Sequence, residues 1–155
     1  MMLVTPFIVT QNLFRQHRDW YFHVPGRPRQ VGRNQMVLDL SRRDVRDHLF
    51  RVIGDILHRS ISVYPSVCPS FRLWFVSSAN VEYLKWDMNR PLTEVFSLAV
   101  ANQVGCEGFT WQAETRHRYV LGLYELQHRI VSTFPHILLE NCASGGKNLL
   151  VMANL

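Results

Sequence analysis

The sequence has few cysteines, and those it has follow no pattern that would cross-link the chain. Cys68, Cys106 and Cys142 are odd in number and show no CxxC spacing. Disulfide scaffolds and structural zinc sites need more cysteines at closer spacing, so we expect reduced thiols and no metal site. The sequence also lacks an N-x-Ser/Thr glycosylation sequon.

Long apolar runs are missing as well. No stretch approaches the roughly 20 apolar residues that a membrane-spanning helix needs. The opening MMLVTPFIV is apolar, but it lacks the basic n-region and the small-residue cleavage site of a signal peptide. With 47% hydrophobic and 19% charged residues, the 155-residue chain fits one globular domain at most. These features favour an intracellular protein without membrane contact.

Lysine is scarce although the chain is basic. Lys85 and Lys147 are the two lysines among 17 basic residues, and the formal net charge is +5. A nucleic-acid-binding domain would interleave basic patches with stacking aromatics, whereas the run PGRPR has a proline in place of the first arginine of a minor-groove hook. The arginines instead alternate with Asp19, Asp44 and Asp47, which indicates an ion-paired helix face. A non-catalytic basic domain that binds nucleic acid stays as the alternative function.

The spacing of apolar residues predicts alternating strands and helices. Strands are predicted at residues 35–40, 81–87 and 136–141. One helix is predicted after Ser41, which begins a Ser-x-x-acid pattern that could cap it. A second helix is predicted at 112–134, where Pro135 ends it. This order is typical of consecutive βα units around a parallel sheet, so the predicted fold class is α/β.

The run YLKWDMNR, residues 83–90, places polar residues at every second position of a predicted strand. Lys85, Asp87 and Asn89 therefore share one face of that strand. One interpretation is a surface strand in which Asp87 pairs with Arg90. In parallel α/β folds, however, the chemistry lies at the carboxyl ends of strands, and Asp87 and Cys142 both follow β-rich runs. Asp87 is therefore a candidate functional carboxylate.

Four blocks of the sequence resemble the α-galactosidases of glycoside hydrolase family 36, the melibiase-like retaining enzymes. The blocks are GRNQMVLDLSRRDVRDHLF, EYLKWDMNR, HRYVLGLYEL and ENCASGG, in that order. The resemblance implies a (β/α)8 barrel, of which residues 1–155 would supply about three consecutive βα units. It implies retaining hydrolysis of terminal α-linked galactose from galacto-oligosaccharides, without metal or organic cofactor and without nucleic acid. It also allows a homo-oligomer of the intact protein.

The same resemblance assigns roles to individual residues. Asp87 would be the catalytic nucleophile, and Lys85, on the same face, would favour its charged form. The substrate-binding roles would fall to Arg33, Lys85, Asn89, Cys142 and Gly145. Without the resemblance, Arg33 would be expected to pair with Asp39, and Cys142 would be a small buried hydrophobe. Trp86 is expected to pack in the core and Glu140 to contact the helix layer.

The sequence also departs from the family pattern. A retaining glycosidase needs a second, protonated carboxyl group, and no acidic residue occupies the strand end after CASGG. We therefore expect the chain to be truncated and inactive alone. Residues 61–78 interrupt the pattern, and the tail at 147–155 leaves it. A surface insertion explains the first departure, whereas retained introns explain both and are the favoured interpretation.

Overall fold

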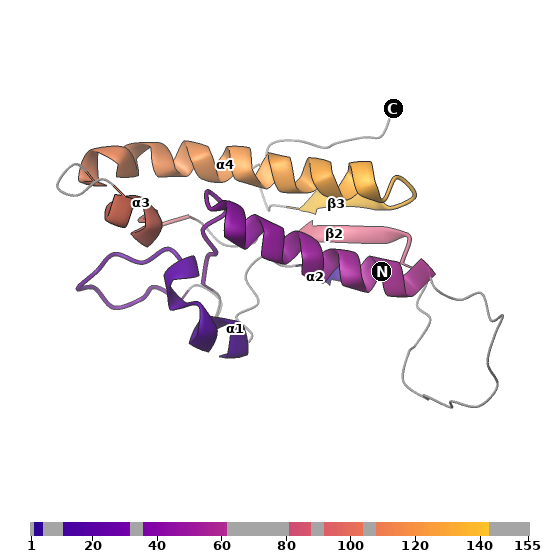
Figure 1. Cartoon of the computed structure of the whole chain (residues 1–155), viewed down its shortest axis with the longest axis horizontal. Coiled ribbons are helices and arrows are strands. Elements are labelled where there is room, and N and C mark those ends of the chain that lie inside the picture. Colours follow the sequence, from indigo (N-terminus) through magenta and orange to yellow (C-terminus); the bar gives the residue numbers. More distant parts are fainter. Residues whose placement is uncertain are drawn as a thin grey trace.

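The computed structural model describes residues 2–4, 11–31, 36–61, 81–87, 92–103 and 108–142. Along the chain the elements are β1 (Met2–Val4), α1 (Gln11–Gln16), the 3-10 turn η1 (Arg18–Trp20), α2 (Arg43–Ile61), β2 (Tyr83–Asp87), α3 (Leu98–Gln103), α4 (Gly108–Thr133) and β3 (Leu138–Cys142). The long helices α2 and α4 lie side by side and run in the same direction (Figure 1). No helix of the described part is long and apolar enough to cross a membrane.

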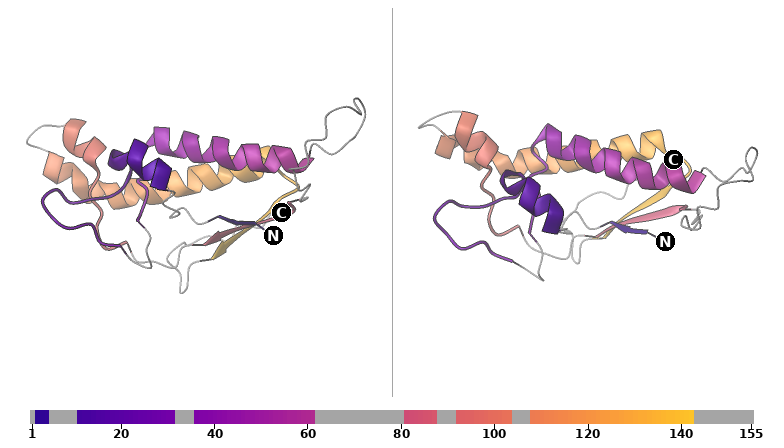
Figure 2. Two further views of the ribbon diagram at one scale, coloured as in Figure 1. Left: turned by 90° about the horizontal axis from the view of Figure 1, so that it is seen from below. Right: turned by 60° about the horizontal axis from the view of Figure 1, so that its bottom comes forward.

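The three strands form one parallel sheet in the order β1-β2-β3. α2 connects β1 to β2, and α4 connects β2 to β3, so each crossover contains a long helix. Figure 2 shows that both helices lie on the same side of the sheet. Within the described residues, the opposite face of the sheet carries no helix. The fold therefore has a helical layer, a sheet and one open sheet face.

The core fills the space between the sheet and the two helices. Leu84 and Trp86 of β2 are fully buried, whereas Tyr83, Lys85 and Asp87 are partly exposed, as strand alternation requires. The buried residues of the helices recur at helical spacing. Among them are Val45, Ile53 and Leu57 on α2, and Tyr119, Leu123, Leu126 and Ile130 on α4. The predicted packing role of Trp86 is confirmed.

The structure confirms the two predicted helices and two of the three predicted strands. β2, β3, α2 and α4 lie where the periodicity placed them, although α4 begins four residues earlier than predicted. The strand predicted at 35–40 is wrong. Of its described residues, Leu38 alone forms a bridge, with Tyr21, and the segment lies beside residues 20–22. β1, not this segment, is the strand that pairs with this side of β2.

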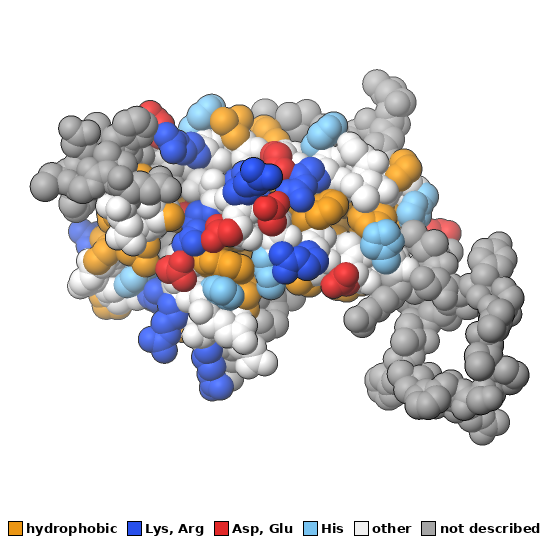
Figure 3. Space-filling model, in the orientation of Figure 1, with side chains coloured by type: hydrophobic (Ala, Val, Ile, Leu, Met, Phe, Trp, Pro, Cys, Tyr) orange, Lys and Arg blue, Asp and Glu red, His pale blue; other side chains and the backbone are white. Residues whose placement is uncertain are grey.

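Ion pairs cross the outer surface of the helical layer. Arg42 contacts Asp19 at 2.7 Å and Asp44 at 2.6 Å, and Arg129 contacts Asp47 at 2.7 Å. Figure 3 shows the basic and acidic side chains alternating across this surface. The predicted ion-paired helix face is confirmed, and the partners include residues of α4 as well as of α2.

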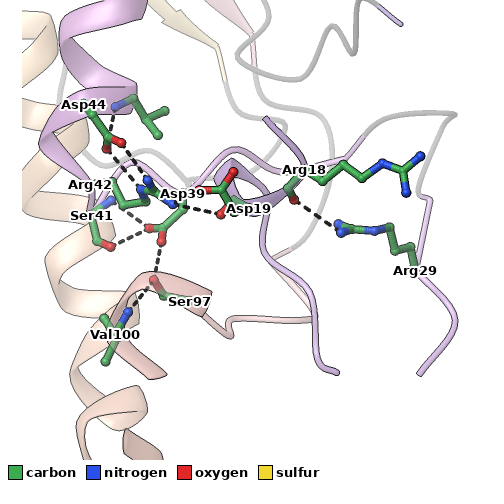
Figure 4. A network of polar contacts seen from close by, with 10 residues as sticks. Arg18, Asp19, Arg29, Asp39, Ser41, Arg42, Asp44, Ser97 and Val100 are labelled. Atoms are coloured by element: carbon green, nitrogen blue, oxygen red, sulfur yellow. Dashed lines mark hydrogen bonds and ion pairs between the residues drawn. The ribbon is translucent and has the colours of Figure 1, made fainter. Parts of the chain in front are cut away.

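A buried carboxylate, Asp39, joins the start of α2 to the start of α3. Its two carboxylate oxygens accept hydrogen bonds from the Ser41 hydroxyl and backbone N–H and from the Ser97 hydroxyl (Figure 4). Ser97 directly precedes α3, and its Oγ also accepts from the Val100 N–H. The expected capping of α2 by Ser41 is therefore wrong: the helix begins at Arg43, and the Ser41 hydroxyl donates to Asp39.

Candidate functional site

The carboxyl ends of β2 and β3 bring Asp87 and Cys142 together. Each is the last residue of its strand, and the two are partners in the parallel register. Neighbouring strands lie about 4.8 Å apart, so their side chains stand next to each other on one face. Both residues are partly exposed. Two residues from distant, separately predicted motifs thus meet at one edge of the sheet.

The face that carries Asp87 is the open face of the sheet. The pairs that project from it are Tyr83 with Leu138, Lys85 with Glu140, and Asp87 with Cys142. The alternate residues Leu84 and Trp86 project into the core under the helices. Polarity therefore increases along the open face from the aromatic and aliphatic pair towards the strand ends.

Lys85 and Glu140 form an ion pair on this face. The distance from Lys85 Nζ to Glu140 Oε1 is 3.6 Å, and the two side chains are 28% and 43% exposed. The expectation that Glu140 contacts the helix layer is wrong. Glu140 lies two residues before Cys142, so strand alternation puts both on the open face. That periodicity was the available sequence signal, but the partner could not be known without the register.

Three of the predicted binding residues lie outside the described residues: Arg33, Asn89 and Gly145. Most of the interruption predicted at 61–78 and the whole predicted tail at 147–155 also lie outside them. Asp39, the alternative partner of Arg33, accepts hydrogen bonds from Ser41 and Ser97. The roles of Arg33, Asn89 and Gly145 therefore stay predictions.

The described part of the open face combines two carboxylates, one ammonium and one thiol. An ammonium offers three hydrogen-bond donors and ionised carboxylates accept them, so this set suits a ligand rich in hydroxyl groups. A carboxylate at a strand end also suits nucleophilic attack. In the described residues, no three His, Cys, Asp or Glu side chains converge to hold a metal ion.

Comparison with known proteins gives one family and several relatives. The chain matches the sequence model of the family Melibiase over residues 4–65 and 72–151. It is 43% identical over 145 residues to α-galactosidase AgaA of Geobacillus stearothermophilus, covering 92% of this chain and 16% of AgaA. It is 38% identical over 136 residues to α-galactosidase Mel36A of Lactobacillus acidophilus, covering 87% of this chain and 15% of Mel36A.

Solved structures agree with these matches. The α-galactosidase of Lactobacillus brevis superposes with a TM-score of 0.70 at 36% identity, over 93% of this chain and 16% of that one. The crystal structure of AgaA, a GH36 α-galactosidase, gives a TM-score of 0.70 at 43% identity, over 93% of this chain and 17% of AgaA. The chain therefore spans about a sixth of the length of these relatives.

Proposed function

Because the chain belongs to the melibiase family, we propose that it forms part of the catalytic barrel of a retaining α-galactosidase. Its three parallel strands and two covering helices correspond to about three consecutive βα units of a (β/α)8 barrel, with the open sheet face directed to the barrel interior. The observation that carries the proposal is the pairing of Asp87 with Cys142 at the strand ends, in a chain 43% identical to AgaA.

The proposed reaction has two steps. Asp87 is the nucleophile in the first step and the leaving group in the second. In the first step the Asp87 carboxylate attacks the anomeric carbon, and a second, protonated carboxyl group gives its proton to the departing glycosidic oxygen. In the second step that carboxyl group takes a proton from water, whose oxygen attacks the anomeric carbon and releases Asp87. Two inversions leave the product with the configuration of the substrate.

The remaining site residues would hold the galactose ring. Lys85 is suited to bond sugar hydroxyls, because its ammonium stands on the same face as Asp87. Arg33, Asn89, Cys142 and Gly145 are proposed to contact the sugar as well. Solved structures of AgaA variants contain raffinose or stachyose, so galacto-oligosaccharides are the proposed substrates.

The test uses a hybrid enzyme, in which residues 4–151, the span that the family model matches, replace the corresponding segment of AgaA. The hybrid is made with and without the predicted insertion at 61–78. We expect the hybrid to hydrolyse nitrophenyl α-galactoside. Asp87→Asn should lower turnover by several orders of magnitude and leave galactose binding intact, because the change removes the nucleophile and keeps its shape.

A matched control separates this effect from a general loss of charge. Asp55 is exposed on α2, and Asp55→Asn should leave turnover unchanged. Near-normal turnover in the Asp87→Asn hybrid would remove Asp87 from the nucleophile role. The nucleic-acid alternative predicts instead that the chain is retained on DNA in a salt-dependent manner.

A further inference from the structure

Lys85 and Glu140 form an ion pair on the open face. The family resemblance assigns a role to Lys85 but none to Glu140 or to the pair. The two residues are register partners on neighbouring parallel strands, and their charged atoms are 3.6 Å apart. Asp87 lies two residues further along β2 on the same face. A single ammonium therefore stands near two carboxylates, one across the strands and one along its own strand.

The pair is poorly suited to a purely stabilising role. Partly exposed ion pairs contribute little to stability, and these side chains are 28% and 43% exposed. The ion pairs on the helical layer use arginine instead: Arg42, Arg43, Arg46, Arg118 and Arg129. Arginine presents a rigid fork to carboxylates, whereas a lysine ammonium has three rotatable donors. A lysine on the open face is therefore suited to donate to the hydroxyl groups of a ligand.

A flexible lysine needs a partner to hold its head group in one place. Glu140 attracts the ammonium towards the seam between β2 and β3 and leaves other donors available. Within the described part of the open face, Asp87 is the carboxylate that would attract Lys85 if Glu140 were neutral. A closer Lys85–Asp87 pair would withdraw donors from the sugar.

Resting on the proposed function, we infer that Glu140 is a positioning residue that holds the Lys85 ammonium for the hydroxyls of the galactose ring. Glu140 acts through Lys85 and takes no proton in the reaction. This assigns Glu140, the glutamate of the block ENCASGG, to substrate binding through Lys85 rather than to the helix layer or to acid catalysis.

The hybrid enzyme tests this assignment through the separation of KM from kcat. Glu140→Gln keeps the shape of the side chain and removes its charge. We expect KM for nitrophenyl α-galactoside to rise on the order of 10-fold to 100-fold, with a smaller change in kcat, because the substrate is held less well. Glu82→Gln is the control: it removes the same charge at an exposed position just before β2 and should change neither constant. Glu140→Asp should recover part of the affinity.

A second variant shows whether Glu140 acts through Lys85. Lys85→Met should raise KM by itself, and adding Glu140→Gln to it should have no further effect. Additive effects in the double variant, or a Glu140→Gln hybrid that behaves like Glu82→Gln, would overturn the positioning role. Loss of raffinose hydrolysis with intact hydrolysis of the aryl substrate would make Glu140 the proton donor and would overturn it too. A folded hybrid without any turnover would overturn the proposed function itself.

Discussion

At the scale of single residues, the carboxylate of Asp39 is buried, and its burial costs free energy because the group loses its hydration. The residue is 1% exposed. Burial raises the pKa of its carboxyl, whereas the hydrogen bonds from Ser41 and Ser97 and the charge of Arg42 act to lower it. Burial together with the charge of Asp39 also raises the pKa of Tyr119. The hydrogen bonds offset part of the lost hydration, because buried carboxylates are tolerated when donors satisfy their oxygens. Asp39 therefore serves to join the start of α2 to the start of α3.

This arrangement predicts that the difference in stability between the parent and the Asp39→Asn variant depends on pH. Because the pKa of Asp39 is higher in the folded than in the unfolded chain, its contribution to stability falls as pH rises from about 4 through the folded value, and then stays constant. Asp39→Asn removes this dependence, so the variant should gain stability relative to the parent as pH rises through that range. Calorimetric melting of the hybrid enzyme between pH 4 and 8 measures the difference.

Alanine at the same position is the contrasting variant. Asp39→Ala leaves two hydroxyls and one backbone N–H of the network without their acceptor, which should cost about 2–4 kcal/mol. If the Asp39→Ala variant melted at the same temperature as the parent at every pH, the Asp39 carboxylate would not be the group that joins the two helix starts.

At the scale of elements, α4 approaches the segment before α2 closely enough to require glycine. A Cβ at Gly122 would lie 2.9 Å from the Leu40 carbonyl carbon, closer still to its oxygen, and 3.1 Å from Arg46 Nη1. Arg46 bridges the same contact, since its Nη1 donates to the carbonyls of Leu40 and Ser41 and its Nε to Glu125. The glycine thus sets the distance across which the arginine network forms.

A pair of glycine substitutions tests this contact. Gly122→Ala should lower stability by at least about 2 kcal/mol, because the methyl group meets rigid backbone. Gly54→Ala on α2 is the matched change: its Cβ would meet only the Phe134 ring, at 3.8 Å, so better helix propensity should add up to about 1 kcal/mol. Thermal melting of both hybrids gives the comparison, and equal shifts of the same sign would refute the close approach.

At the scale of the whole molecule, the described sheet has one covered and one open face. β1 and β3 are each paired on one side only within the described residues, and Leu138 is 57% exposed. Unpaired strand edges are templates for intermolecular pairing. The proposed reaction needs two carboxyl groups about 5 Å apart. The described open face holds one carboxylate, Asp87, at its strand ends.

We therefore predict that the 155-residue chain expressed by itself associates and has no α-galactosidase turnover. Light scattering and size-exclusion chromatography measure the association, and an activated aryl α-galactoside measures turnover with little need for acid assistance. A monodisperse monomer with a sharp melting transition would contradict the first part. Turnover that disappears in the Asp87→Asn chain would contradict the second.

Local patterns in the sequence were enough to predict α2, α4, β2 and β3. Helical and strand periodicity depends on residues within a few positions of one another, and Pro135 marks the end of the second long helix. The same patterns placed Asp87 and Cys142 at strand ends. The resemblance to the α-galactosidases rested on such contiguous blocks, and the family match bears it out.

Tertiary structure alone decided which segments pair. Residues 36–40 have strand-like composition but lie beside residues 20–22, while the three-residue strand β1, too short for a periodic signal, pairs with β2. The Asp39–Ser97 bond spans 58 positions, and the Lys85–Glu140 pair depends on the register of two strands separated by α4. Strand register and sheet order follow from packing between distant residues, which local periodicity does not encode.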